Sequence, residues 1–463
     1  MADMASLTGP PPTEANPLRV LANDYRAERT AAEQGGLPPG FTDFSWKRTK
    51  SFASAPLPLL LDAYERFGPI FSIRILHGVQ VFMLGPAANH YITVSHASNF
   101  SWREGHFRDL IPFLGDGLLT IDGTFHRQSR RIMLPAFHRE RIAAAHETMR
   151  EETDRALSTW REGDRIDLDG WMRTLALRIA MRALFGLDPD AARGELDAAH
   201  EFEVALGFHG RDYLLQILRG PKTPFAQLVA ARRKLDGLIY AEIERRRRTG
   251  ERGQDILSLL LDAQDEDGAQ LSDRHVRDEV MTLLFAGHDT TTSTVGFMFY
   301  ELALSPEEER LLVADLDAGS DARLDLVLDE TLRKYPAAWI GPRRSIEPFA
   351  FAGHQVAGGV SISYSSWASH HLPDVWPDPE RFDPERFAPG RVETIPKGAY
   401  VPFGGGSRTC IGMRFGEAEI RTIARRILAD WHLELEPGYT LRIQQTPTIG
   451  PRGELPFRIR RRR

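Results

Sequence analysis

The chain is poor in cysteine, in net charge and in long apolar runs, and each shortage excludes a class of protein. Cys410 is the only cysteine among 463 residues, so an intrachain disulfide and a multi-cysteine zinc site are impossible. The 58 Lys and Arg against 64 Asp and Glu leave a formal charge of −6, which argues against broad nucleic-acid binding. No stretch reaches the roughly 18 apolar residues of a membrane span, and residues 1–18 lack the basic and apolar regions of a signal peptide. We therefore expect a soluble, cytoplasmic protein without a membrane anchor.

The remaining composition predicts a folded protein that is mainly α with a small β region. Hydrophobic residues make up 42% and charged residues 26% of the chain, which are ordinary globular values. Residues 1–40 are expected to form a flexible lead-in, and residues 41–463 a single domain. Alternating patterns predict strands at 70–75 and 79–84. Helical periodicity predicts helices at 139–159, 168–185, 198–218, 225–248, 272–304 and 412–431, and dense Pro and Gly predict an irregular segment at 336–409.

The single cysteine stands in the loop Phe403-Gly404-Gly405-Gly406-Ser407-Arg408-Thr409-Cys410-Ile411-Gly412. Three glycines allow a tight turn with amide groups directed inward, and a predicted helix begins directly after Cys410. Because a helix N-terminus and a nearby arginine both favour an anion, we expect a lowered pKa and a thiolate. A thiolate here can be a nucleophile or a metal ligand. A phosphate cradle is a third interpretation, although its Gly-x4-Gly-Lys-Ser/Thr signature is missing, and a buried, inert cysteine is the ordinary one.

The longest predicted helix carries Ala286-Gly287-His288-Asp289-Thr290-Thr291 in its middle. A glycine in a helix lets a flat cofactor approach the backbone closely. A hydroxyl group paired with a carboxylate can relay protons to a reacting oxygen. The ordinary alternative is a threonine-rich helix whose hydroxyl groups donate back to carbonyl groups four residues earlier.

Two pairs of charged residues have helical spacing. Glu330 and Arg333 are three positions apart, and His126 and Arg130 are four apart, so each pair shares one face of a helix. Alone, such pairs are usually solvated contacts that contribute little stability. His126 and Arg130 can nevertheless reach one anionic group together.

These motifs resemble, in the same order along the chain, those of the cytochromes P450. The cysteine loop matches that family's haem-binding signature Phe-x-x-Gly-x-Arg-x-Cys-x-Gly, and the resemblance covers roughly residues 60–449. It implies a triangular helical prism around a buried haem b. Cys410 is then the axial ligand of the iron, and Thr290 and Asp289 are the catalytic acid–alcohol pair.

The resemblance also assigns roles to other side chains. Haem contacts are implied for His126, Arg130, Arg344, Arg408, Phe403, Gly404, Gly412, Ala286 and Gly287. The choice of Arg344 for a haem propionate leaves its neighbour Arg343 as the alternative. Glu330 and Arg333 are expected in a buried structural network with Arg386, chosen over Arg381 for its distance from the cysteine loop.

The implied reaction inserts one oxygen atom of O2 into an apolar substrate by hydroxylation or epoxidation. NAD(P)H is expected to supply electrons through a separate ferredoxin and ferredoxin reductase, which dock near Arg127 and Arg131. The protein is expected to be a monomer, and its substrate a fatty acid, terpenoid, steroid or polyketide. The pocket is expected to include Phe107, Phe113, Phe285, Ala338, Trp339, Ile340 and Thr448, with His106, Arg108 and Arg211 as candidate carboxylate anchors.

Two alternatives stay open at this point. The same fold can serve a peroxygenase or an isomerase, which would need no electrons from NAD(P)H. A haem-free cysteine hydrolase or binding protein would be colourless, and its Cys410 would react with alkylating agents.

Overall fold

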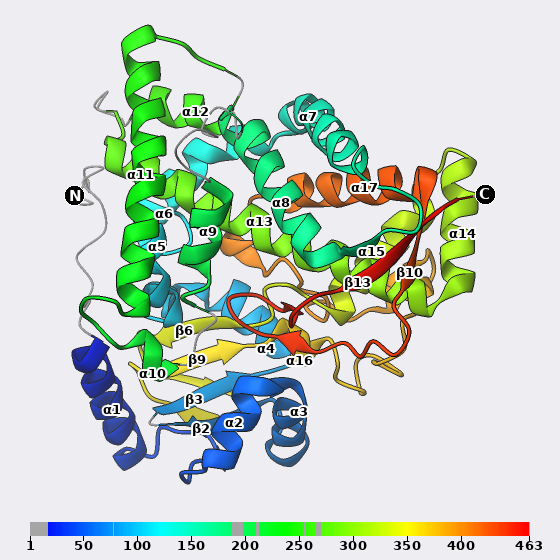
Figure 1. Cartoon of the computed structure of the whole chain (residues 1–463). Helices are drawn as coiled ribbons and strands as arrows, with labels where there is room; N and C mark the ends of the chain where they lie inside the picture. The colour runs from blue at the N-terminus through cyan, green and yellow to red at the C-terminus, as the bar shows by residue number, and fades with distance from the viewer. Residues whose placement is uncertain are drawn as a thin grey trace.

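A computed structural model describes residues 17–76, 78–187, 190, 198–209, 213–253, 255–264 and 270–462. Helices occupy the larger part of the molecule (Figure 1). The helices are α1 Pro17–Glu33, α2 Trp46–Ser54, α3 Pro56–Phe67, α4 Pro86–His90, α5 Ile111–Leu114, α6 Gly123–Met133, α7 Arg139–Leu157, α8 Leu168–Ile179, α9 Ala198–Leu206, α10 Tyr213–Gln216, α11 Pro224–Thr249, α12 Ile256–Asp262, α13 Asp273–Leu304, α14 Pro306–Asp317, α15 Ala322–Lys334, α16 Ser366–Ser369 and α17 Met413–Asp430.

The strands form one larger sheet and three small ones. They are β1 Gly40–Phe41, β2 Ile70–Ile75, β3 Gly78–Met83, β4 Phe100–Ser101, β5 Arg165–Asp167, β6 Gly341–Ser345, β7 Phe349–Phe351, β8 His354–Val356, β9 Ser361–Tyr364, β10 Trp431–Leu435, β11 Ile443–Gln444, β12 Gly450–Pro451 and β13 Pro456–Arg461. The larger sheet has the order β1-β2-β3-β9-β6-β4. Strands β2, β3, β6 and β9 lie together at the bottom of the view, and β10 and β13 lie apart from them at the right (Figure 1). Its β2–β3 pair is antiparallel, with Ile70 opposite Met83, which confirms the two strands predicted from the alternating pattern.

Helix α13 is the central element of the fold. The Ser272 hydroxyl accepts a hydrogen bond from the backbone N–H of His275 and so caps the helix at its predicted start. Most residues of α13 are buried, on every face of the helix, which is typical of a helix in the core of a large domain. It packs against α8, α11, α15 and α17, and Figure 1 shows these helices around it. Helix α17, which follows the cysteine loop, thus packs on α13.

Two expectations about local structure need correction. The helix expected at 198–218 is divided into α9 and the short α10, with residues 210–212 between them outside the described part. Residues 17–33 form helix α1, so the expected flexible lead-in does not extend over this segment. Asp24 of α1 pairs with Arg108 at 2.7 Å, and Glu28 accepts a hydrogen bond from the backbone N–H of Val79. These contacts attach α1 to the sheet.

Within the part of the chain that the structure describes, no helix combines the length and the apolar character that a bilayer span requires.

Candidate active site

The cysteine loop is closed by its own backbone and needs glycine at its turn. The backbone N–H of Cys410 donates to the carbonyl oxygen of Phe403 at 3.0 Å. Gly406 has a positive φ of 62°, and a Cβ atom there would lie 2.0 Å from the carbonyl oxygen of Thr93. No other residue fits this position without moving the chain. The loop therefore holds Cys410 at the start of α17, as the glycine pattern predicts.

Without a bound metal ion, Cys410 favours the neutral thiol and not the predicted thiolate. The backbone N–H groups of Gly412 and Met413 donate to its sulfur, and the charge of Arg130 also favours the anion. Burial nevertheless outweighs these contacts and raises the pKa of the thiol. The prediction of a lowered pKa is therefore wrong for the isolated chain, because the helix N-terminus does not offset the loss of hydration. A bound metal cation would supply the missing positive charge and deprotonate the thiol.

Cys410 retains accessible surface even though its sulfur lies deep in the protein. The same is true of one position on α13: Ala286 is exposed although Phe285 and His288 on either side are buried. A Cβ atom on the adjacent Gly287 would meet no atom within 4 Å. The core of the fold thus offers accessible, largely apolar surface on α13 and on the cysteine loop, as a flat, apolar cofactor requires.

A cluster of basic residues lies beside the loop, and it consists of the buried His126 and Arg343 and the half-buried Arg130 and Arg408. Burial, together with the charges of Arg408 and Arg130, lowers the pKa of His126 to about 3. Burial, together with the charges of Arg343 and Arg130, lowers the pKa of Arg408 to about 10. Among the described residues, the carboxylate of Asp122 pairs with Arg408, and its charge also acts on His126 and Arg343. Because its positive charge exceeds this one carboxylate, the cluster favours binding of an anionic group, and the two propionates of haem fit this requirement.

Arg343, and not Arg344, belongs to this cluster. Arg343 is buried, and its guanidinium carbon lies 3.6 Å from the ring centroid of Trp102. Arg344 instead pairs with Asp24 of α1 and donates to the carbonyl oxygen of Gly359 at 2.9 Å. Both arginines lie on β6, where successive side chains point to opposite faces of the sheet. The expectation for Arg344 is corrected accordingly.

This difference predicts unequal effects of two matched variants on haem binding. We expect Arg343→Met to weaken haem retention by about 10- to 100-fold, the effect of losing one hydrogen bond to a charged group. Arg344→Met removes the same charge one residue away and should change haem retention by less than about 3-fold, because its contacts are to α1. Haem transfer from each variant to apomyoglobin measures this. Equal transfer rates would refute the assignment.

Thr290 belongs to the motif Ala286–Thr291 in the middle of α13. The hydroxyl of Thr290 donates to the carbonyl oxygen of Ala286 at 2.8 Å, which is the back-bonding expected of a helical threonine. Thr290 is nevertheless only half-buried, so it keeps accessible surface on the helix face that carries Ala286 and Gly287. One contact therefore satisfies the donor, while the oxygen remains free to accept a further hydrogen bond.

Asp289 lies in a charged network that the sequence does not reveal. Its carboxylate accepts a hydrogen bond from Arg173 of α8 at 2.9 Å and another from the hydroxyl of Thr448. Arg173 also pairs with Asp169 at 2.8 Å and lies 3.6 Å from Glu203 of α9. These carboxylates raise the pKa of Arg173 above its ordinary value in spite of its burial. Asp289 is therefore held in place by Arg173 and Thr448, and sequence reasoning missed Arg173 as a partner of Asp289.

A side-chain hydrogen bond joins α13, which carries Thr290, to α17, which follows Cys410. The hydroxyl of Thr291 donates to Glu419 of α17 at 3.2 Å. Burial raises the pKa of Glu419 to about 8, so its side chain is mostly neutral at pH 7. Burial of the neutral acid costs less than burial of a carboxylate, although Oε1 of Glu419 makes no hydrogen bond within the described residues.

The charge network expected around Glu330 is present and buried. Arg333 donates to Glu330 at 2.7 and 2.9 Å, and neither side chain has exposed surface. Arg386 lies 3.4 Å from the same carboxylate. Arg381 contributes only its backbone carbonyl oxygen, as an acceptor for Arg333. The structure therefore places Arg386 in the network, as the sequence spacing suggests.

The residues expected in the substrate pocket fall into two groups. Phe113 and Phe285 are in ring contact, with centroids 6.4 Å apart. Ala338 and Ile340 keep accessible surface, but Trp339 between them is buried on the other side, where its indole N–H donates to Gln445. The expectation for Trp339 is therefore corrected, because neighbouring side chains of an extended segment point in opposite directions.

The other candidates are placed elsewhere. Phe107 stacks on Trp102 with centroids 4.6 Å apart, and Thr448 is bound to Asp289. Arg108 is paired with Asp24, which leaves it no free charge for a carboxylate ligand. Arg211 and the side chain of His106 lie outside the described residues.

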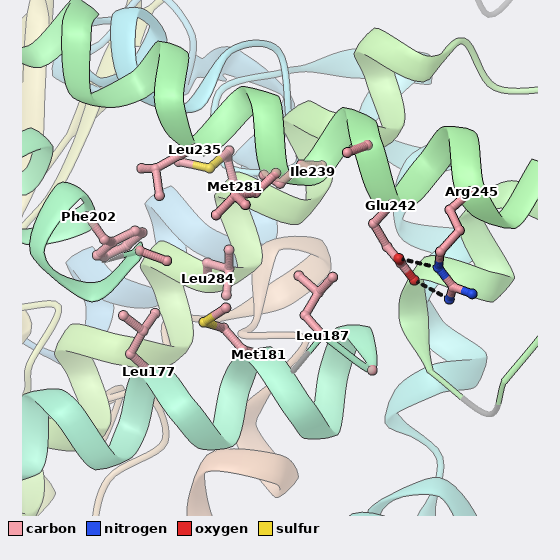
Figure 2. Close-up of a pocket in the computed structure, with 14 residues that line it drawn as sticks. Leu177, Met181, Leu187, Phe202, Leu235, Ile239, Glu242, Arg245, Met281 and Leu284 are labelled. Atoms are coloured by element: carbon pink, nitrogen blue, oxygen red, sulfur yellow. Dashed lines mark hydrogen bonds and ion pairs between the residues drawn. The ribbon is translucent and has the colours of Figure 1, made fainter. Parts of the chain in front are cut away.

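A separate cavity of about 470 Å³ lies between α8, α9, α11 and α13. Figure 2 shows its walls of leucine, isoleucine, methionine and Phe202 side chains, with the Glu242–Arg245 ion pair at one end. None of the seven residues expected in the substrate pocket lines it, and neither does the cysteine loop. Met281 and Leu284 of its wall lie on α13 shortly before Phe285 and Ala286.

Comparison with known proteins agrees with the geometry of the site. The family model for cytochrome P450 matches residues 55–452. Two similar proteins come from Streptomyces melanosporofaciens. Cyclooctat-9-en-7-ol 5-monooxygenase is 34% identical, with 92% of this chain and 94% of that protein covered, and cyclooctatin synthase is 33% identical, with 74% and 79% covered.

Solved structures give the same result at the level of the fold. The structure of a retinoic acid-bound cyanobacterial CYP120A1 has a TM-score of 0.81 at 26% identity, with 92% of this chain and 99% of that chain covered. The cytochrome P450DA haem domain also has a TM-score of 0.81, at 25% identity with 92% and 98% covered. The chain therefore belongs to the cytochrome P450 family and is a monooxygenase of that family.

Proposed function

We propose that this monooxygenase hydroxylates or epoxidises an apolar, polycyclic terpenoid, with Cys410 as the axial ligand of haem b. The observation that carries the assignment of the cofactor site is the basic cluster beside Cys410, in which the three arginines outnumber Asp122, the carboxylate that pairs with Arg408 within the described residues. The aromatic character of Phe113, Phe202 and Phe285 supports an apolar substrate. A polycyclic terpenoid is proposed because cyclooctat-9-en-7-ol 5-monooxygenase is similar along nearly the whole chain.

The residues of the site would hold the cofactor from three directions. Cys410 supplies the sulfur, and the N–H groups of Gly412 and Met413 tune its basicity. His126, Arg130, Arg343 and Arg408 supply donors for the propionates. When bound, a haem with a thiolate ligand supplies O2 activation and O–O cleavage. Ala286 and Gly287 leave the surface of α13 open to a flat group.

Thr290 and Asp289 are proposed to bind and transfer protons on the face of α13 that carries Ala286 and Gly287. The Thr290 hydroxyl holds its proton on the Ala286 carbonyl oxygen and offers its lone pairs to a neighbouring donor. The Asp289 carboxylate accepts from Arg173 and Thr448, so it must exchange one of these contacts before it can accept and pass on a proton. Glu203, whose side chain is 39% exposed, lies near Arg173 and links this network to solvent.

Electrons are proposed to come from NAD(P)H through a ferredoxin reductase and a ferredoxin. Helix α6 directs His126 and Arg130 inward toward the site, while Arg127 and Arg131 of the same helix are exposed. An acidic ferredoxin that docks on this outer face would lie one helix away from the propionate-binding cluster. This arrangement supports Arg127 and Arg131 as docking residues.

The test uses the haem-loaded protein with a ferredoxin, its reductase, NADPH and 18O2, and a tricyclic diterpene as substrate. We expect one 18O atom in the product and no turnover when NADPH is omitted. Product formation with hydrogen peroxide alone would favour a peroxygenase, and an isomeric product without added oxygen would favour an isomerase. A colourless protein that cannot be loaded with haem would favour a cysteine hydrolase or binding protein and refute the proposal.

A further inference from the structure

His209 has a buried ring nitrogen without a partner. It lies directly after α9, retains 4% of its surface exposed, and its Nε2 atom makes no hydrogen bond within the described residues. A buried polar atom without a partner destabilises a fold, so each such atom in a native protein requires a physical reason. Burial lowers the pKa of His209 to about 4, and its imidazole is therefore neutral at pH 7. A neutral imidazole can donate from one nitrogen and accept at the other.

The surroundings of His209 connect it to the proposed substrate pocket. Its ring centroid lies 5.1 Å from that of Phe208 and 6.3 Å from that of Phe113. Phe113 is in turn in contact with Phe202 at 5.5 Å and with Phe285 at 6.4 Å. Phe285 immediately precedes Ala286, the accessible position on α13. We call these four phenylalanines and His209 the aromatic cluster; the ring of His288 also contacts Phe202, but it lies 3.2 Å from the Glu203 carboxylate.

We infer that Nε2 of His209 binds an oxygen atom of the substrate, so that the preferred substrate is an apolar polycycle that already carries one hydroxyl or carbonyl group. This inference rests on the proposed function and adds a polar requirement to an otherwise apolar substrate. A pure hydrocarbon would leave the nitrogen without a partner in the complex. A hydroxyl group in reach would satisfy it and fix the orientation of the polycycle above α13.

A buried polar group distinguishes between ligands more strongly than an apolar wall does. A pocket lined by phenylalanine accepts hydrocarbons of similar shape with little selectivity, whereas a buried hydrogen-bonding group rejects a ligand that cannot pair with it. A phenylalanine at position 209 would fill nearly the same space without an unpaired atom. Such a variant should therefore fold at least as stably and lose only its preference for oxygenated ligands.

The test measures binding rather than turnover. Haem-loaded wild type, His209→Phe and Phe208→Leu are dialysed to equilibrium against a radiolabelled tricyclic diterpene hydrocarbon and against its monohydroxylated derivative. We expect wild type to bind the alcohol about 10-fold more tightly than the hydrocarbon, the effect of one net hydrogen bond. His209→Phe should bind both within about 2-fold, with hydrocarbon affinity and melting temperature no lower than in wild type. Phe208→Leu changes the packing on the same ring and should keep the preference.

Three outcomes overturn the inference in distinguishable ways. If wild type binds both ligands equally, the substrate class stands and the role of His209 is refuted. If His209→Phe keeps the preference, another group binds the oxygen. If wild type binds neither ligand, the proposed terpenoid substrate fails, and the inference fails with it.

Discussion

Replacing Cys410 with serine is expected to abolish the strongly red-shifted absorption band of the reduced protein under CO. That band requires a thiolate on the iron, and a serine hydroxyl has too high a pKa to replace it. The chain contains no second cysteine that could substitute. Oxygen insertion should fall by at least about 1000-fold, because the push of electron density from sulfur that favours O–O cleavage is lost. Absorption spectra and product analysis of the same preparation measure both effects.

Ser407→Ala is the matched control for this variant. Ser407 lies in the same loop, three residues before Cys410, and is exposed, so its loss should leave the band unchanged. The single thiol permits a second measurement: at alkaline pH, where a thiol with a raised pKa ionises, Cys410 should react with iodoacetamide in haem-free protein and be protected after haem is added. A red-shifted band in Cys410→Ser, or equal alkylation with and without haem, would contradict ligation by Cys410.

The elements that the sequence predicts well are those with strong local signals. Helix α13 begins at the predicted serine cap, and β2 and β3 form the predicted hairpin, because capping and alternation depend on neighbouring residues. The pair of Glu330 and Arg333 follows from helical spacing in the same way. Helix α1 was not predicted, because its segment is polar and its attachment depends on Asp24 and its partners in distant parts of the chain.

The errors in the candidate site have specific physical causes. Motif position alone could not separate Arg343 from Arg344, but the alternation of β6 would have placed them on opposite faces. The pKa of Cys410 depends on how deeply the sulfur is buried, a quantity that the loop sequence does not contain. The partners of Asp289 come from α8 and from residue 448, more than 100 positions away in either direction, so no local pattern could reveal them.

The second large effect is expected from Arg333→Met, which should destabilise the fold by about 3–5 kcal/mol, the usual cost of leaving a buried charge without its partner. Arg333 donates twice to Glu330 and also to the carbonyl oxygens of His370 and Pro379 at 2.9 and 2.8 Å. Its removal takes two hydrogen bonds from Glu330 and leaves the carbonyl oxygens of His370, Pro379 and Arg381 without this donor, while Glu330 keeps the backbone N–H of Asp383 at 2.9 Å. Burial already raises the pKa of Glu330, so the carboxylate would take up a proton or draw water into the core. The midpoint of urea unfolding, followed by circular dichroism and by haem release, measures the loss.

The magnitude of this effect follows from burial and not from the spacing of the two charges. Arg310 and Glu307 on α14 have the same three-residue separation and a shorter contact, 2.6 Å, but both side chains are more than 60% exposed. Arg310→Met should therefore leave the unfolding midpoint unchanged, because water replaces the lost contact.

The loss of stability in Arg386→Met should lie between those of Arg310→Met and Arg333→Met. Arg386 is buried, but it contacts Glu330 at 3.4 Å and donates mainly to the Asp378 carbonyl oxygen. If Arg333→Met, Arg386→Met and Arg310→Met changed the unfolding midpoint equally, the buried network around Glu330 would contribute no more stability than a surface ion pair. That result would refute its proposed structural role.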